Sequence, residues 1–218
     1  ACGFEVVKEY YVNDAGRQMD ILAASVYLRM KEATGRETRY PSLAYQGDYV
    51  RRIAENQLKS SLLTIEIEEF AFDEVELKGE SDSDLDNLIA EIKEVLGLEN
   101  FARLKAYAAS VITGSIREDL ENFRVDFEEW YSEQKMHDFG MIDSVLSNLD
   151  SKGHTYIRDK ATWFRSAALG DEKDRVLIRE NGAKTYFAAD VAYHSDKFNR
   201  GFARLVNIWG ADHHGYIA

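Results

Sequence analysis

Tyr186 and Asp190 stand four positions apart in a stretch whose residue types change from strand-like to helical. Residues 184–187 alternate and residues 188–194 follow a helical pattern, so Tyr186 and Asp190 share a helix if that helix begins near Tyr186. Side chains four residues apart share a helix face, and a phenol beside a carboxylate suits a planar cation. A guanidinium group fits best, because its paired N–H donors match both carboxylate oxygens. The alternative is a surface Asp at a helix terminus and a half-buried Tyr.

A second set of candidate residues follows the apolar run 205–209, which we predict to be a buried strand. Gly210, Asp212 and His213 come directly after it. Small residues let a ligand approach the backbone, and open α/β sheets hold their ligands beyond the carboxyl ends of their strands. The pattern therefore predicts a ligand site at the end of this strand.

Asn13 and Asp14 form a third candidate set, between a predicted strand at 4–12 and a predicted helix at 15–32. A strand that leads through a polar elbow into a helix is another place where α/β proteins bind ligands. The alternative is that one of the two residues is only the N-cap of the helix.

The composition describes an acidic globular chain of 218 residues, enough for one large domain or two small ones. Its net charge of −12 argues against a main nucleic-acid-binding surface and suits a cytoplasmic protein. The single cysteine excludes an internal disulfide and a multi-cysteine zinc site. No apolar run approaches the roughly 20 residues that span a bilayer, so we expect no membrane contact.

The middle of the chain is predicted to be almost wholly helical. Ser83 followed by Asp86 is typical of a helix N-cap. A short strand is expected at 125–127, where apolar and polar residues alternate. The predicted helices are residues 49–60, 85–96, 101–113, 116–123 and 138–151.

Two β-hairpins are predicted after this helical part. The first joins residues 155–157 to residues 161–164. The second joins residues 176–179 to residues 185–187 through Asn181-Gly182, a strong hairpin turn signal.

Three strings resemble those of bacterial arginyl-tRNA synthetases. They are T-Y-x-x-x-D-x-A-Y-H-x-D-K-F at 185–198, W-G-A-D-H-H-G-Y at 209–216 and E-Y-Y-x-N-D-A-G-R-Q-M at 9–19. The resemblance implies an α/β fold: part of the class I synthetase Rossmann-type nucleotide-binding fold, interrupted by a mainly helical connective insertion. The implied domains are residues 1–49 and 155–218 for the two parts of the catalytic domain, the second including the hairpins, and residues 50–154 for the insertion.

The resemblance also implies roles for the candidate residues. In that family the Tyr and Asp of the first string hold the guanidinium of arginine, and the G-x-D-H part of the second string faces the adenosine of ATP. The implied arginine-binding residues are Tyr186, Asp190, Asn13 and Asp14, and the implied ATP-binding residues are Gly210, Asp212 and His213.

The family joins arginine to tRNA(Arg) through arginyl-adenylate, with ATP as substrate and Mg²⁺ expected to accompany it. The resemblance implies a monomer without a tightly bound protein-ligated metal. Neither the H-x-G-H string nor a K-M-S-K-type string of the family occurs in this sequence. We therefore expect an excised internal part of a longer enzyme, with no catalytic residue of its own and inactive alone.

Two alternative functions remain. Asp212, His213 and His214 could serve a metal-dependent phosphoesterase, although three consecutive side chains point in different directions and rarely meet one ion. The chain could also be a non-catalytic tRNA-docking module, against which its acidic composition speaks.

Overall fold

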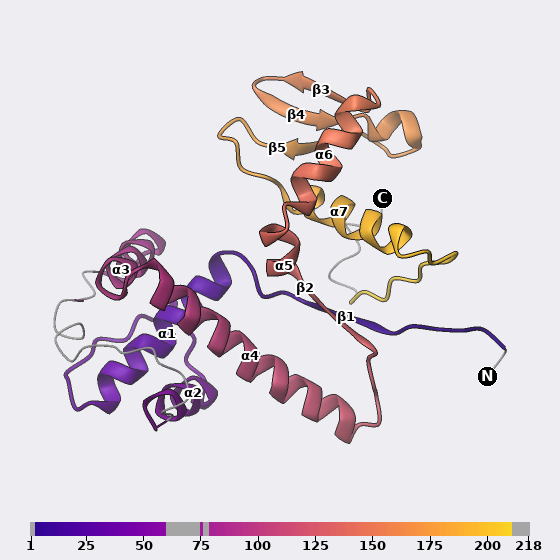
Figure 1. The fold of residues 1–218 in the computed structure, drawn as a ribbon. Helices are drawn as coiled ribbons and strands as arrows, with labels where there is room; N and C mark the ends of the chain where they lie inside the picture. Colours follow the sequence, from indigo (N-terminus) through magenta and orange to yellow (C-terminus); the bar gives the residue numbers. More distant parts are fainter. Residues whose placement is uncertain (1–2, 60–74, 76–78, 211–218) are drawn as a thin grey trace. The chain divides into compact units, whose positions relative to one another are not determined.

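The computed structural model describes residues 3–59, 75 and 79–210, and the chain divides into two compact units (Figure 1). The first unit is Ala1–Glu133 and the second is Gln134–Ala218. The described residues form seven α-helices and five short strands. The strands make two small sheets, so the predicted α/β class is confirmed in this broad sense.

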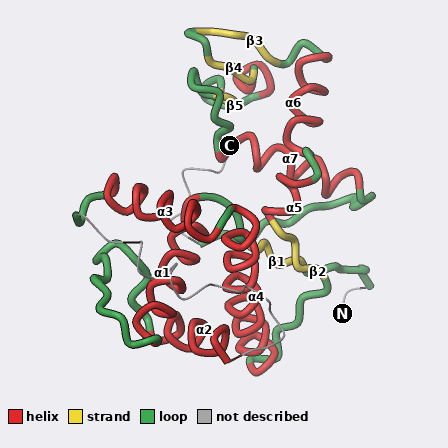
Figure 2. The backbone as a smooth tube through the Cα atoms, turned by 60° about the vertical axis from the view of Figure 1, so that its left-hand side comes forward, coloured by secondary structure: helices red, strands yellow, loops and turns green. Residues whose placement is uncertain are grey.

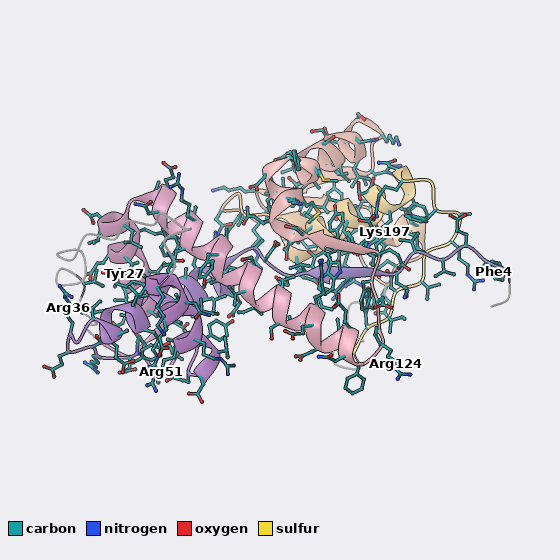
Figure 3. All side chains as sticks on the ribbon, turned by 60° about the horizontal axis from the view of Figure 1, so that its bottom comes forward. Phe4, Tyr27, Arg36, Arg51, Arg124 and Lys197 are labelled. Carbon is teal, nitrogen blue, oxygen red and sulfur yellow. The ribbon has the colours of Figure 1, made fainter. Side chains whose placement is uncertain are left out.

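The first unit begins with a strand that leads into a buried helix. Strand β1 spans Glu9–Val12, which is only the second half of the strand predicted at 4–12, and helix α1 spans Arg17–Ala33, which confirms the predicted helix. Residues 21–31 of α1 are buried without a break. Tyr27, labelled in Figure 3, is fully buried among them. Because neighbours enclose α1 on most sides, this helix forms the centre of the first unit.

Helix α1 packs against three further helices, which Figure 2 shows as one cluster. These are α2 (Asp48–Lys59), α3 (Asp82–Leu96) and α4 (Leu98–Asn122). Each fully buried Val, Leu, Ile or Phe side chain contributes about 1.5–3 kcal/mol relative to an exposed one. The helices bring together Val50, Ile53, Leu85, Leu88, Ile92, Phe101 and Leu104.

The start of α3 corrects the sequence prediction, because Ser81 and not Ser83 is the N-cap. The Asp84 backbone N–H donates to Ser81 Oγ at 3.2 Å, and the Ser81 N–H donates to the Asp84 carboxylate at 2.9 Å. This capping box lowers the pKa of Asp84, chiefly through its hydrogen bond with the Ser81 side chain. Asp86, the predicted partner, accepts instead from Arg17 Nε at 2.8 Å. The same spacing of Ser and Asp occurs twice in this acidic stretch, and the earlier pair caps the helix.

Helix α4 is continuous where the sequence predicted two helices at 101–113 and 116–123. Gly114 lies within it and is exposed. Glycine costs only about 1 kcal/mol in a helix interior. The cost is too small to break a helix whose first half is packed in the core.

The strand predicted at 125–127 is also misplaced. Strand β2 spans Glu129–Ser132 and pairs in parallel with β1. Pairing starts where the backbone N–H groups of Glu128 and Glu129 donate to the carbonyl oxygen of Lys8, at 3.0 and 3.2 Å. Parallel strands need a long crossover connection, and α1–α4 lie within it.

Phe127 lies outside the strand and belongs to an aromatic cluster. Its ring meets Tyr10 edge-on at 5.4 Å and Trp130 at 6.0 Å, measured between ring centroids. Tyr10 and Trp130 stack at 4.7 Å as partners across the β1–β2 pair. These aromatic contacts stabilise the two-stranded sheet beyond its hydrogen bonds.

Two helices precede the sheet of the second unit. They are α5 (Glu133–Asp138) and α6 (Met141–Ser151), in place of the single helix predicted at 138–151. Gly140 separates them in a left-handed conformation (φ 63°), which glycine adopts without strain.

The first predicted hairpin is confirmed. Strand β3 (Thr155–Arg158) pairs antiparallel with β4 (Ala161–Phe164). Asp159 and Lys160 between them have positive φ angles of 51° and 60°. Two such residues define the turn whose twist matches that of the strands.

The second predicted hairpin is wrong in its second strand. After the 3₁₀ turn η2 (Ser166–Leu169), strand β5 (Arg175–Ile178) pairs with β4. The chain does turn at Asn181-Gly182, but it returns to β5 only through an isolated bridge from Lys184 to Ile178 and through hydrogen bonds of Thr185, and it adds no strand to the sheet. A helix then starts at once, which removes residues 185–187 from the sheet.

The run 205–209 forms no strand. Val206 is 72% exposed and Ile208 is 92% exposed. An apolar run forms a strand only where a neighbouring strand accepts its hydrogen bonds, and no described strand pairs with this run. Within the described residues, no helix combines the length and the apolar character required to cross a membrane.

The capping box of α3 can be tested by replacing each serine separately. We expect Ser81→Ala to lower the free energy of unfolding by about 1 kcal/mol, because the Asp84 N–H loses its acceptor. Ser83→Ala is the matched control, with an expected change within about 0.5 kcal/mol. Urea unfolding followed by circular dichroism measures both, and a larger loss for Ser83→Ala would contradict the observed cap.

Candidate functional site

Helix α7, Tyr186–Asn199, carries both residues of the candidate guanidinium site. Tyr186 is its first residue and Asp190 follows one turn later, so both side chains leave from one face. Tyr186 is 49% exposed and Asp190 is partly buried. The helix start near Tyr186 that a shared face requires is therefore observed, while guanidinium binding stays a prediction.

Thr185 determines where α7 begins. Its Oγ1 accepts from the backbone N–H of Ala188 at 3.3 Å as the N-cap. The same hydroxyl donates to the carbonyl oxygen of Val176 at 2.7 Å. The Thr185 backbone N–H donates to the carbonyl oxygen of Leu177, a fully buried residue of β5, at 3.0 Å. Thr185 thus caps the start of α7 and connects the helix to β5 through hydrogen bonds.

Small residues form most of the buried side of α7. Ala188, Ala189 and Ala192 are buried, which allows close packing against α6 and β5. Successive residues turn by about 100° around a helix. Tyr186 and Asp190 therefore lie beside the buried face and not within it.

The segment after α7 is attached to the helix through Lys197, labelled in Figure 3. Lys197 Nζ donates to Asn207 Oδ1 at 3.1 Å and lies 3.9 Å from the centre of the Tyr193 ring. The segment that leads to Gly210 is therefore held near the second half of α7, and Gly210 itself is exposed. Three further candidates lie outside the described residues: Asp212, His213 and His214.

Asp14 connects the ends of the two parallel strands in the first unit. Its Oδ2 accepts from Ser132 Oγ, the last residue of β2, at 2.6 Å. The N-cap of α1 is Gly16, so the alternative that Asn13 or Asp14 caps this helix is wrong. Asn13 is exposed beside them. All of these polar groups lie at the carboxyl ends of parallel strands, where α/β sheets hold ligands.

Ser132 is a polar residue beside the candidate site that could not be recognised from the sequence. Its only sequence signal is a small polar residue at the end of a short aromatic strand. That signal has no meaning until β1 and β2 are known to be neighbours.

The candidate residues fall into two groups, one in each unit. Asn13 and Asp14 belong to the first unit, whereas Tyr186, Asp190 and Gly210 belong to the second. Among the residues that the structure describes, no cluster of three or more His, Cys, Asp or Glu side chains could hold a metal ion.

A shallow pocket in the first unit involves none of the candidate residues. Arg117, Glu121, Phe127 and Trp130 contribute to its lining. The guanidinium carbon of Arg117 lies 4.5 Å from the centre of the Trp130 ring. The pocket lies beside the aromatic cluster of β1 and β2.

An ion pair holds the strand that supports α7. Arg175, the first residue of β5, donates to both carboxylate oxygens of Asp171, from Nε at 2.6 Å and from Nη2 at 2.8 Å. The Asp171 side chain is only 8% exposed. The Arg175 guanidinium holds the pKa of Asp171 well below its usual range.

Comparison with known proteins identifies similar chains. The arginine–tRNA ligase of Hydrogenovibrio crunogenus is 48% identical, with 99% of this chain and 38% of that protein aligned. The arginine–tRNA ligase of a Psychrobacter species is 47% identical, with 100% of this chain and 38% of that protein aligned. A scan against protein-family models gives no match.

The structure itself resembles a solved one. A crystal structure of a Campylobacter jejuni protein, assigned as an arginyl-tRNA synthetase, has a TM-score of 0.74 and 33% identity. It covers 99% of this chain and 41% of the other chain. The fold and the relatives define the class: the chain is homologous to aminoacyl-tRNA synthetases. Within that class it is homologous, along its whole length, to one segment of arginyl-tRNA synthetases, about 38% of the length of the curated relatives.

The ion pair below α7 gives a pH-dependent expectation. A carboxyl whose pKa is lower in the folded chain stabilises the fold above its unfolded pKa of about 3.9, and this stabilisation is lost as the pH falls. Asp171→Asn should therefore lower the melting temperature at pH 7. The difference from the unmodified chain should shrink as the pH falls below about 4.

Thermal unfolding of both chains between pH 7 and pH 3 measures this difference. Glu172→Gln changes an exposed neighbouring carboxyl and is the matched control, with little expected effect. A loss for Asp171→Asn that persists unchanged at pH 3 would show that the ion pair is not its cause.

Proposed function

We propose that this chain is the arginine-selecting segment of a longer arginine–tRNA ligase. Tyr186 and Asp190 would hold the guanidinium of arginine, with the carboxylate accepting two N–H bonds and the phenol beside it. The observation that carries the proposal is the start of α7 at Tyr186, which puts both side chains on one face. Homology to arginyl-tRNA synthetases supports it independently.

The reaction would proceed in two steps. A carboxylate oxygen of arginine attacks the α-phosphorus of ATP, the bond from that phosphorus to the bridging oxygen breaks, and pyrophosphate leaves. The terminal ribose hydroxyl of tRNA(Arg) then attacks the carbonyl carbon of arginyl-adenylate and AMP leaves. Such catalysis depends on positioning and on stabilising phosphate charge, for which Mg²⁺ would accompany ATP.

The other candidate residues would bind the rest of the substrates. Asn13 and Asp14 would face the amino-acid side. The backbone of Gly210 would let adenosine approach closely, because glycine has no side chain. Asp212 and His213 would meet the ribose.

We also propose that the two-stranded sheet is part of a Rossmann-type nucleotide-binding fold with a mainly helical insertion. The parallel pairing of β1 with β2 supports this, since parallel strands joined through helices are typical of that fold. Residues 1–49 and 155–218 would form the parts of the catalytic domain. The pairing favours an end of the insertion near Glu129 instead of His154. We further propose that the protein is cytoplasmic and monomeric.

The chain alone should not activate arginine. It lacks the H-x-G-H and K-M-S-K-type strings that resemblance assigns to phosphate binding. Arginine-dependent pyrophosphate exchange by this chain should stay at background, with or without added tRNA(Arg). Robust exchange would refute this division of roles.

The role of Asp190 can be tested in the full-length enzyme that carries this segment. Asp190→Asn removes the charge that a guanidinium would meet and keeps the shape of the side chain. We expect KM for arginine to rise by roughly 30-fold or more, because the guanidinium of arginine would lose the carboxylate that pairs with it. KM for ATP should change by less than about threefold.

Asp196→Asn is the matched control on the same helix. Asp196 pairs with Arg200, at 3.0 Å, and has no proposed contact with arginine. Equal losses for arginine and ATP in Asp190→Asn, or the same losses in Asp196→Asn, would make Asp190 a structural residue.

A further inference from the structure

Asn181 is followed by a glycine, and no other asparagine of the chain has this neighbour. The pair lies in the turn that connects β5 to α7 (Figure 1). Residues 179–184 of this turn are all exposed. Water therefore reaches both the side-chain amide of Asn181 and the backbone nitrogen of Gly182.

The conformation of the turn explains why glycine stands at position 182. The turn closes through two backbone hydrogen bonds: Gly182 N–H donates to the carbonyl oxygen of Arg179 at 2.9 Å, and Arg179 N–H donates to that of Ala183 at 2.9 Å. Gly182 has a φ angle of 81°, in the left-handed region that side chains disfavour. Nothing lies within 4 Å of the position that a Cβ atom would take there. The turn therefore keeps an unhindered backbone nitrogen directly after an asparagine.

The Asn181 side chain is held against the turn. Its Oδ1 accepts from the Ala183 backbone N–H at 3.0 Å, which is the hydrogen bond of an Asx-turn. An N–H donor stabilises the negative charge that develops on a carbonyl oxygen under attack. The Gly182 nitrogen belongs to the same chain, so its attack on Asn181 Cγ needs no collision between molecules. The hydrogen bond from Gly182 to Arg179 opposes the attack, because it must open first.

We propose that Asn181 is a site of spontaneous deamidation. The Gly182 nitrogen bonds to Asn181 Cγ, the bond from Cγ to the amide nitrogen breaks, and the proton of the Gly182 N–H leaves with that nitrogen as ammonia. Water then opens the resulting succinimide ring at either carbonyl group. Cleavage at Cγ gives aspartate, and cleavage at the main-chain carbonyl gives isoaspartate. In both cases the amide and a water molecule become a carboxyl group and ammonia.

The isoaspartate product changes the junction between β5 and α7. Its main chain runs through the former side chain and is longer by a methylene group. Two hydrogen bonds span this position, from Arg179 N–H to Ala183 and from Thr185 N–H to Leu177, at 2.9 and 3.0 Å. Neither keeps its geometry around a longer main chain. The aspartate product leaves the main chain unchanged, and its carboxylate still accepts from Ala183, so only isoaspartate weakens the start of α7.

The first test follows this chain during incubation at neutral pH, below its melting temperature. Peptide mapping by mass spectrometry locates each amide that becomes an acid. We expect Asn181 to react at least about tenfold faster than any other asparagine, because a side chain on the following residue hinders the nitrogen and raises the barrier. Asn181→Gln is the matched control, since the longer side chain would have to close a larger ring. The turn of that variant should lose little ammonia.

Unfolding the chain in guanidinium chloride separates the effect of the sequence from that of the turn. The hydrogen bond from Gly182 to Arg179 lies in an exposed turn, and such a bond slows the reaction by about tenfold at most. The rate at Asn181 in the unfolded chain should therefore exceed the native rate by no more than about this factor. An increase of about 100-fold or more would mean that the native turn protects Asn181.

The products are compared after they have been separated by chromatography. An endoproteinase that cleaves before aspartate cuts the aspartate product at position 181 and leaves the isoaspartate product intact there, which identifies each fraction. Asn181→Asp reproduces the aspartate product alone. This variant should melt at the temperature of the unmodified chain, whereas the isoaspartate fraction should melt at a lower one.

The proposal is wrong if Asn181 reacts no faster than the other asparagines, or if Asn181→Gln loses ammonia from the turn at the same rate. Protection by the native turn would contradict it as well. Equal melting temperatures of the two products would contradict the effect on α7. These measurements involve neither arginine nor ATP, so this experiment and the Asp190→Asn experiment can fail separately.

Discussion

A single threonine connects the sheet of the second unit to the helix that carries the candidate site. The Thr185 hydroxyl accepts from the first turn of α7 while it donates to a carbonyl oxygen of β5. Because each helical residue turns by about 100°, a helix that started one residue later would point different side chains toward the same neighbours. The rotational position of Tyr186 and Asp190 therefore depends on this one hydroxyl and on the backbone bond beside it.

Several parts of the fold that follow from local pattern were predicted correctly. Helix α1 and the β3–β4 hairpin are set by apolar spacing and by turn residues that lie within a few positions. The start of α7 is local too, since Thr185 has the side chain of a good N-cap. The shared face of Tyr186 and Asp190 could for this reason be predicted from the sequence.

Several of the errors concern partners that are far apart in the chain. Asn181-Gly182 does form a turn, yet β5 pairs with β4 and the chain after the turn becomes helical. The run 205–209 has the composition of a strand but no described neighbour to pair with. Ser132 lies beside the candidate residue Asp14 only because β2 pairs with β1. The overall net charge was misleading in a similar way. It averages an acidic first unit with a second unit in which acidic and basic residues nearly balance.

The pairing of β1 with β2 also affects how this protein is made on the ribosome. Glu9 and its partner Glu129 are 120 positions apart. At roughly 5–20 residues per second, about 6–24 s pass between the synthesis of the two strands. During that interval β1 has an unsatisfied hydrogen-bonding edge, while α1–α4 can already assemble around their own core. During that interval the nascent chain is therefore exposed to chaperones and to misassociation through a segment of only four residues.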